Sequence, residues 1–275
     1  MTSQVSTSEQ VFAARRTKRL LLFTILILLV LGVAVMSVSA GQFSVPVSDL
    51  GRVLSKGPLG ARLLDEPVVW RIRIPRVLLG LLVGAALGVG GALMQAVFAN
   101  PLAEPSVIGV TSGAGVGAAF VLVTGWNFLG GSTVPLAAFI AGLGLLVSIS
   151  MAGTLDLLAL GDRAAGHVGI DVQRLRFAAI TTATLLTAGA VSYAGLIGFV
   201  GLVIPHIVRT IVGPANKILI PASALGGAVL VAGADMVART AVNFADLPIG
   251  IFTALVGGPT FFILLRRLMK RGGMR

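Results

Sequence analysis

Long uninterrupted apolar stretches recur along this chain, and they constrain its fold more than any other feature. Eight are long and apolar enough to be interpreted as membrane spans: Leu20–Ala40, Val77–Phe98, Ser106–Thr124, Val134–Leu155, Phe177–Tyr193, Leu196–Val212, Ile218–Val237 and Pro248–Leu265. A helix of about 21 residues rises about 31 Å, which matches the hydrocarbon core of a bilayer. The sequence therefore predicts an all-α integral membrane protein, a polytopic bundle of about eight transmembrane helices forming one domain over residues 1–275. We expect the sixth span, which is short and contains Pro205, to be kinked or only partly helical.

The composition supports this class. Hydrophobic residues make up 56% of the chain and charged residues 11%, whereas a soluble domain carries about 25% charged residues. A globule this apolar could not cover its own surface, so lipid must solvate most of it. The chain has no cysteine, which excludes disulfides, thiolate metal sites and thiol nucleophiles.

The basic residues indicate an orientation. The net charge is +11, but the positive side chains cluster at the ends of the apolar stretches, as in membrane proteins, rather than forming a nucleic-acid footprint. Basic clusters precede the first stretch (Arg15, Arg16, Lys18, Arg19) and follow the last (Arg266, Arg267, Lys270, Arg271, Arg275). The sequence therefore predicts a multi-pass protein of the cell membrane, with residues 1–19 and 266–275 both in the cytoplasm. The first stretch resembles a signal peptide ending at Val38-Ser39-Ala40, but its apolar part exceeds the usual 7–15 residues, so we expect a retained helix.

An even number of spans places residues 41–76 outside the cell as one long loop. This segment is unusually basic for an external loop, with Arg52, Lys56, Arg62, Arg71, Arg73 and Arg76 against Asp49, Asp65 and Glu66. Charges in a long translocated loop need not determine topology. Alternatively, the segment is a basic surface for an acidic extracytoplasmic partner. The charge pattern leaves both interpretations open.

Residues 157–176 form a polar island, LLALGDRAAGHVGIDVQRLR, between two apolar stretches. It is the internal segment with enough charged, helix-compatible residues to dock a water-soluble partner. The same topology places it in the cytoplasm, together with Asn100–Pro105 and the His206–Lys217 turn.

Motifs for catalysis or cofactor binding are missing. No P-loop motif occurs, and the glycine-rich runs near Gly90 and Gly115 follow no strand. We place His167 and His206 in separate loops without a carboxylate at ligand spacing, and Ser192 with His206 lacks an orienting acid. The sequence therefore predicts neither a metal site, nor a cofactor, nor an enzyme.

Ionisable residues inside a membrane are functional candidates. Asp235 and Arg239 lie at i and i+4 near the outer end of the seventh stretch, where we expect an ion pair, and Gln95 and Asn100 lie near the inner end of the second. No carboxylate falls near a span midpoint, as a proton- or sodium-driven carrier requires. The energy source is therefore expected to be a partner that acts on the polar island.

Small residues one helical turn apart let helices pack closely in lipid. Such pairs occur at Gly84/Gly88 and Gly113/Gly117, and Gly226 lies near Leu230. Close packing within one subunit and a seam between subunits both remain open.

Several motifs resemble a known family. The run from Arg71 to Ala118, RIRIPRVLLGLLVGAALGVGGALMQAVFANPLAEPSVIGVTSGAGVGA, is similar to the FecCD-type permease subunits of binding-protein-dependent ABC importers, which take up ferric siderophores, haem or vitamin B12. The runs LLALGDRAAGHVGI, GLIGFVGLVIPHIVR and GADMVARTAVNFADLPIGIFTALVGGPTFFILLRR match in the same order, so the resemblance covers nearly the whole chain.

The resemblance implies a homodimer with a central path, a cytosolic ABC ATPase dimer on one side and an extracytoplasmic substrate-binding protein on the other. It implies that ATPase-coupling residues lie in the polar island: Gly161, Asp162, Arg163, Ala164, Ala165 and Gly169. It implies further that Arg73, Arg76 and Arg239 dock the binding protein and that Asn100, Pro101 and Leu102 form part of a cytoplasmic gate.

The chain departs from the family in length. Family members usually have ten spans, and about two spans' worth of sequence is missing after Ile140. The missing part resembles the end of the fourth helix, the whole fifth helix and the start of the sixth. Fusion at Ala141–Leu155 would keep every later element on its proper side. A smaller departure is Gly213–Lys217, where relatives read closer to G-P-D/N-H-R.

Three functions therefore stay open. The first is a permease for haem or ferric siderophore, with vitamin B12 less favoured. The second is a non-transporting or regulatory remnant that keeps its assembly but lacks the complete path. The third is an intramembrane enzyme, for which no catalytic constellation is visible.

Overall fold

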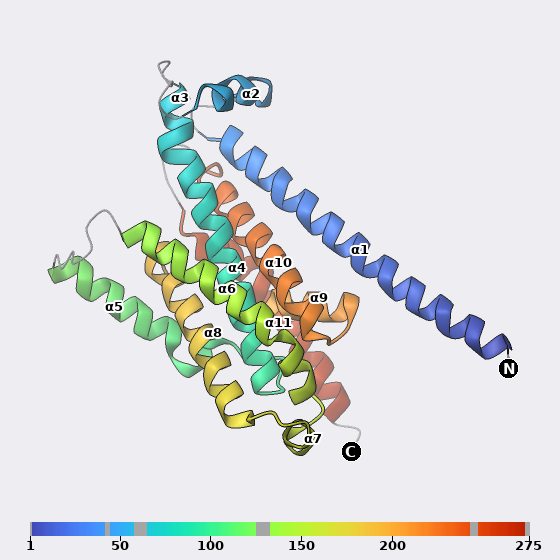
Figure 1. The fold of residues 1–275 in the computed structure, drawn as a ribbon. Coiled ribbons are helices and arrows are strands. Elements are labelled where there is room, and N and C mark those ends of the chain that lie inside the picture. The colour runs from blue at the N-terminus through green and yellow to red at the C-terminus, as the bar shows by residue number, and fades with distance from the viewer. Residues whose placement is uncertain (1, 42–44, 58–64, 125–132, 243–246, 273–275) are drawn as a thin grey trace.

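A computed structural model describes residues 2–41, 45–57, 65–124, 133–242 and 247–272, and among these every regular element is helical (Figure 1). The elements are α1 (Thr2–Ser39), α2 (Val47–Lys56), α3 (Asp65–Val68), the π-helical turn η1 (Val69–Arg73), α4 (Ile74–Val97), the 3₁₀ turn η2 (Pro105–Ile108), α5 (Val110–Thr124), α6 (Thr133–Leu158), α7 (Asp162–His167), α8 (Val172–Ala194), α9 (Val200–Val212), α10 (Asn216–Ala238) and α11 (Ile249–Gly272). The predicted all-α bundle is confirmed.

Each of the eight predicted spans coincides with a helix. Within the described residues, six segments meet the length and hydropathy that a membrane crossing requires, and they lie in α1, α3–α4, α6, α8, α10 and α11. Helix α5 has 15 residues and α9 has 13. A 13-residue helix rises only about 20 Å, so α9 is too short to cross a bilayer alone.

The centre of the bundle is the pair α4 and α10. Backbone approaches backbone here, because a Cβ atom on Gly84 would lie 2.1 Å from the carbonyl oxygen of Gly227 and one on Gly88 would lie 2.3 Å from that of Ser223. The Gly84/Gly88 pair therefore packs inside one subunit, as one of the two sequence interpretations proposed. Gly113 and Gly117 of α5 face open space, because a Cβ atom on either would have no neighbouring atom within 4 Å.

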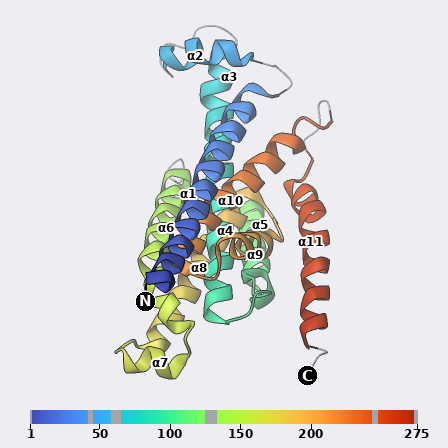
Figure 2. The same cartoon turned by 90° about the vertical axis from the view of Figure 1, so that its right-hand side faces the viewer.

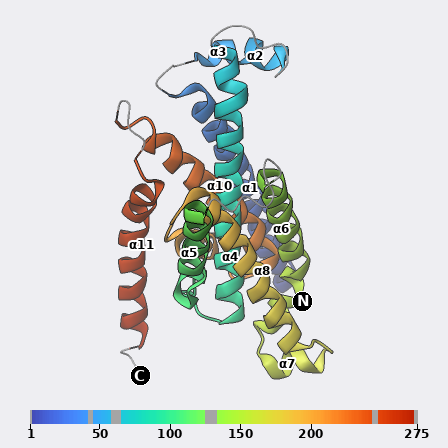
Figure 3. The ribbon, with the colours of Figure 1, turned by 90° about the vertical axis from the view of Figure 1, so that its left-hand side faces the viewer.

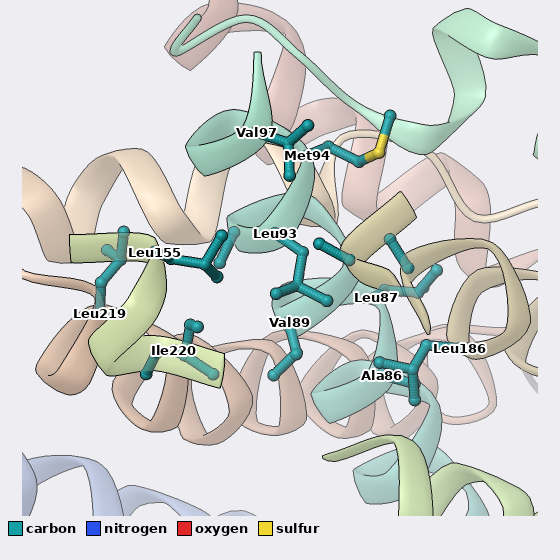
Figure 4. Packing of buried hydrophobic residues seen from close by; sticks show 14 of the residues in the cluster. Ala86, Leu87, Val89, Leu93, Met94, Val97, Leu155, Leu186, Leu219 and Ile220 are labelled. Carbon is teal, nitrogen blue, oxygen red and sulfur yellow. The ribbon is translucent and has the colours of Figure 1, made fainter. Parts of the chain in front are cut away.

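The apolar core lies around the C-terminal half of α4. Figure 4 shows its side chains meeting those of three neighbouring helices. The labelled residues are Ala86, Leu87, Val89, Leu93, Met94 and Val97 of α4, Leu155 of α6, Leu186 of α8, and Leu219 and Ile220 of α10. This core holds α6 and α8 against the α4–α10 pair.

The sixth predicted span is helical only in its second part, as expected. Residues 195–199 have no regular secondary structure, Phe199 adopts a left-handed conformation (φ 68°), and α9 begins at Val200. In Figure 2, α9 is seen nearly end-on, whereas α11 runs from the top of the picture toward the bottom. Non-helical backbone at this depth is tolerated only where protein buries it. Here Ile197 is buried, and a Cβ on Gly257 of α11 would lie 2.2 Å from the Cβ of Phe199.

Pro205 explains a second feature of α9. A proline lacks the N–H that would donate to the carbonyl four residues earlier, that of Gly201. The fully buried Gln95 of α4 supplies the missing donor through Nε2, at 3.2 Å from Gly201 O and 3.3 Å from Leu202 O. Gln95 therefore links α9 to α4 at the centre of the bundle.

Within the predicted external segment over residues 41–76, the described residues 47–56 and 65–76 are helical. Helix α3, η1 and α4 run on as one helical segment, and the π turn precedes Pro75. The Ile74 N–H reaches the carbonyl of Val69, five residues back, because the proline ring disturbs the ordinary pattern just beyond it. Helix α2 packs on this segment through Leu50 and Val53, and the Trp70 indole N–H donates to Val53 O at 3.1 Å.

The two ends of the bundle differ. Helices α2 and α3 lie at one end, and α7, the turn after α4 and the chain termini lie toward the other (Figures 1 and 3). Helix α6, which contains residues 141–155 where the missing segment was placed, is one continuous helix over Thr133–Leu158.

Candidate functional site

Helix α7 forms the tip of the bundle at the end that carries the termini (Figure 2). Ala165 is fully buried against the core, whereas Asp162, Arg163 and Ala164 are exposed. The Asp162 carboxylate accepts from Arg176 of α8 at 2.8 Å, so an ion pair ties the start of α7 to the next helix. Four of the predicted coupling residues, Asp162 to Ala165, thus lie on one small anchored helix, and Gly161 and Gly169 flank it.

Two glycines allow the sharp turns on either side of α7. Gly161 precedes the helix with φ 107° and Gly169 follows it with φ 83°, and residues with a Cβ rarely adopt these angles. After the second turn, the Asp171 side chain caps α8 by accepting from the Arg174 N–H at 3.1 Å. The two turns therefore make α7 a separate short helix between α6 and α8.

The three arginines predicted to dock a partner lie at the opposite end of the bundle. Arg73 donates to the carbonyl of Val38 at 2.7 Å, and Arg239 donates to the carbonyl of Ala40 at 2.7 Å and to that of Ser37. These oxygens belong to the end of α1, where helical carbonyls have no partner in their own helix. Arg73 and Arg239 are 6% and 9% exposed, so their guanidinium groups anchor the C-terminal end of α1.

Arg76 has a different environment. It pairs with Asp235 of α10, with Nη2 2.9 Å and Nε 3.0 Å from Oδ1, and its side chain is 40% exposed. The predicted pair of Asp235 with Arg239 is confirmed at 3.4 Å. The carboxylate therefore links Arg76 to Arg239 across α4 and α10. Arg52 and Arg71 are exposed at the same end.

The predicted gate residues lie in the turn after α4. Asn100 Oδ1 accepts from the Leu102 N–H at 2.9 Å, so the side chain stabilises a tight turn around Pro101. Ala99 just before it has a positive φ of 47°. This turn faces the same end as α7.

Glu104, which the sequence analysis did not select, connects this turn with the break before α9. Its carboxylate accepts from the backbone N–H of Phe199 and from the hydroxyl of Ser106. Burial raises the pKa of the Glu104 carboxyl above its ordinary value of 4.5, and these two hydrogen bonds oppose part of the rise. An acidic residue inside an otherwise apolar ANPLAEPSV run was the available signal.

Asp156 was also missed. It lies near the end of α6, and its oxygens accept from the backbone N–H groups of Asn216 at 2.5 Å and Lys217 at 3.4 Å. It therefore caps α10 from another helix, since Ala215 at the cap position offers no side-chain acceptor.

Other sequence candidates gain no chemistry from the fold. The Ser192 hydroxyl donates to the carbonyl of Ala188 in its own helix at 2.8 Å. His167 ends α7, and His206 lies inside α9 rather than in a loop, which corrects its expected position. Among the described residues, no group of three or more His, Cys, Asp or Glu side chains could hold a metal ion.

A small cavity lies beside the Arg76–Asp235 pair, between α4, α8, α10 and α11. It has a volume of about 220 Å³ and is lined by Gly80, Val83, Tyr193 and Val231 among others. A drug-sized ligand needs about 300 Å³ or more. This cavity is thus too small for a large chelate.

Fold and site together define a polytopic helical membrane protein with a polar element at each end. The chain belongs to the FecCD transport family, whose model matches residues 25–145 and 140–267. The two matched segments meet at residues 140–145, where the sequence analysis places the missing helices.

Curated relatives support the family over most of their own length. The chain is 31% identical to the ABC transporter permease protein YvrB of Bacillus subtilis (87% of this chain, 91% of the relative). It is 32% identical to the vitamin B12 import system permease protein BtuC of Klebsiella pneumoniae (94% and 96%) and 31% identical to the hemin transport system permease protein HmuU of Yersinia pestis (93% and 98%). The last alignment spans 335 residues, whereas this chain has 275.

A solved structure shares the fold. It is described as an inward-facing conformation of a putative metal-chelate type ABC transporter, with a TM-score of 0.75 and 26% identity over 90% of this chain and 99% of that one. The chain is therefore a transmembrane permease of this family that is shorter than its relatives.

Proposed function

We propose that this chain is the transmembrane subunit of an ATP-driven importer for haem or a ferric siderophore. Relatives named for hemin and for vitamin B12 match it to the same degree, so the comparisons do not separate the two substrates. The Ala224–Pro259 run resembles haem-type members, and this resemblance is our reason for preferring the iron chelate. ATP hydrolysis would occur in a partner ATPase dimer.

Helix α7 is the observation that carries this proposal. It is an exposed six-residue helix with one buried contact at Ala165 and one ion pair at Asp162. A helix held in this way can transmit a push from a soluble motor to α6 and α8 without unfolding. In the proposed topology α7 and both termini are cytoplasmic, and α2 and α3 are extracytoplasmic.

The size of the internal cavity supports a homodimer. A homodimer would place the substrate path between two copies of the chain, because the cavity beside Arg76 has a volume of only about 220 Å³. Helices α5 and α11 offer apolar faces for such a contact, because Val116, Phe120, Leu255 and Phe262 are exposed.

For the binding protein, we propose docking at the end that carries α2. Arg76 would meet an acidic partner directly. Arg73 and Arg239 would contribute by fixing α1 and Asp235 beneath the contact, given their burial.

Co-isolation of the full chain with its ATPase tests the coupling role. Arg163→Ala removes an exposed cation of α7 and should reduce the recovered ATPase several-fold. Arg174→Ala is the matched control, because this arginine is exposed at the same end but lies on α8 and pairs with Asp171. Equal loss in both variants, or unchanged recovery with Arg163→Ala, would remove the coupling assignment.

A non-transporting remnant is the second candidate, and the missing segment after residue 140 motivates it. ATP-dependent uptake of labelled haem or ferric siderophore into proteoliposomes separates the two. Uptake that requires the ATPase supports the importer, whereas stable assembly with no uptake of haem, siderophore or vitamin B12 supports the remnant.

A further inference from the structure

A cavity of about 780 Å³ opens at the basic end of α1. Its walls come from three separate parts of the chain: the start of the apolar part of α1, the end of α6 and the turn between α9 and α10. The lining residues are Arg15, Lys18, Arg19, Asp156, Ala159, Leu160, Ile211, Val212, Gly213, Pro214 and Ala215. In Figure 1 the N-terminal part of α1 diverges from the bundle on this side.

The cavity is positively charged. Arg15, Lys18 and Arg19 follow an i, i+3, i+4 pattern, which places them on one face of α1, and all three line the cavity. None of them forms an ion pair with another described residue. The carboxylate of Asp156 is the acid in the lining, and it already accepts the N–H groups at the start of α10. The lining therefore carries three cations against one carboxylate, and that carboxylate pairs with none of them.

The surroundings of the cavity fit a lipid headgroup. Leu20 and Leu21 follow the basic residues immediately and are exposed, as are Leu160 and Ile211 on the opposite wall. Polar lining thus gives way to apolar surface over a few residues, as at the boundary of a bilayer. In Figures 2 and 3, α7 extends farther toward this end than α1 does.

We propose that this cavity binds the phosphate headgroup of an anionic phospholipid, with Arg15, Lys18 and Arg19 as its ligands and the acyl chains along Leu20, Leu160 and Ile211. Two arginines and a lysine can each donate charge-assisted hydrogen bonds to phosphate oxygens. A basic pocket between membrane helices is a recognised form of headgroup site. The bound lipid would bridge α1 to the α9–α10 turn, and the inference is independent of the proposed transport activity.

Native mass spectrometry of the full chain in detergent tests the site. Phosphatidylglycerol and phosphatidylcholine of the same chain length are added in turn, and inorganic phosphate is added in a separate arm. A juxtamembrane cation contributes about 1 kcal/mol to binding of anionic lipid, so each single change to Gln should weaken phosphatidylglycerol binding about fivefold. The triple variant Arg15→Gln, Lys18→Gln, Arg19→Gln should weaken it on the order of a hundredfold.

Arg16→Gln is the matched control. Arg16 is exposed on the same turn of α1 but does not line the cavity, so this variant should keep phosphatidylglycerol binding. Binding that falls equally with Arg16→Gln would show general attraction to a basic helix and overturn the site. Equal binding of phosphatidylcholine, or occupation by millimolar inorganic phosphate that excludes phosphatidylglycerol, would also overturn it. Thermal unfolding of each variant without added lipid checks that the fold is retained.

Discussion

Gly91 has no space for a side chain, because a Cβ atom on it would lie 1.9 Å from the carbonyl oxygen of Gly201. We expect Gly91→Ala to force α4 and α9 apart and to destabilise the protein by about 1–3 kcal/mol or more, as overpacking does. The control is Gly189→Ala in α8, where no atom lies within 4 Å of the new Cβ. That change should be neutral or stabilise the helix by up to about 1 kcal/mol. Thermal unfolding in detergent micelles measures both, and equal stabilities would contradict the close contact.

Glu104 should make stability depend on pH. Burial raises the pKa of its carboxyl in the folded protein above 4.5. Between the unfolded and folded pKa values the folded state holds more protons than the unfolded chain, so stability falls as pH rises through this window. Glu104→Gln keeps an acceptor for Phe199 but removes the titration. We expect equal stability near pH 4 and a more stable variant at pH 7.

Unfolding temperatures measured from pH 4 to pH 8 test this expectation. Ser106→Ala provides the second variant, because the Ser106 hydroxyl favours the charged carboxylate. Its loss should make the fall in stability with pH steeper than in the unchanged chain. A Glu104→Gln profile parallel to that of the unchanged chain would show that another group causes the pH dependence.

Individual residues differ in how far sequence could predict their role. The spacing of Gly84 and Gly88 predicts close packing on one helix face, and α10 lies there. The partners of Gly91 and Glu104 come from residues about one hundred positions later, and helical periodicity does not encode that distance. Arg73 and Arg239 were expected to dock an external partner. In the structure they donate instead to backbone carbonyls at the end of α1, a contact that depends on where α1 lies.

Helix α9 depends on a side chain from another helix. Gln95→Leu should leave the carbonyl of Gly201 without a donor, because Pro205 has no N–H to offer it, at a cost of about 1–3 kcal/mol for a buried unsatisfied group. Pro205→Ala restores an N–H four residues after Gly201. In that background Gln95→Leu should therefore cost less, with an interaction energy of about 0.5 kcal/mol or more.

The measurement is a double-mutant cycle of unfolding free energies in one detergent. The two single variants and the double variant are compared with the unchanged chain. A cost of Gln95→Leu that is the same with proline and with alanine at position 205 would show that the amide does not compensate for the proline.

The sequence predicted where helices occur better than it predicted where each helix begins and ends. Apolar length located a helix in each of the eight predicted spans, and six of these helices are long and apolar enough to cross a bilayer among the described residues. It could not show that α3, η1 and α4 continue as one helix through a segment with charged residues, since packing of α2 through Leu50 and Val53 stabilises it. Pro205 predicted an interruption in the sixth span. The interruption lies ahead of the proline, because α8 ends before Gly195 and α9 begins only at Val200.

For the whole molecule, the missing segment has little effect on the arrangement of the rest. Helix α6 is continuous through residues 140–145, where the two parts of the family model meet. Loss of two crossings keeps the number of crossings even, so we expect α7, α8, α10 and α11 to keep the sides that the family pattern gives them. The contact between α4 and α10 through Gly84 and Gly227 involves no residue near this junction.

The sidedness of the two ends gives a prediction for the whole chain. The protein has no cysteine, so Gly166→Cys in α7 and Gly51→Cys in α2 each create a single thiol. Both glycines are exposed, and no atom lies within 4 Å of the new Cβ. Because basic residues flank both termini, we expect α7 on the cytoplasmic side and α2 on the opposite side. In sealed vesicles of known orientation, an impermeant maleimide should label residue 51 from the extracytoplasmic face only and residue 166 from the cytoplasmic face only, and both should react after solubilisation. Labelling of both from one face would be incompatible with an α4 that crosses the bilayer between them, and reversed labelling would move the proposed ATPase contact to the wrong side of the membrane.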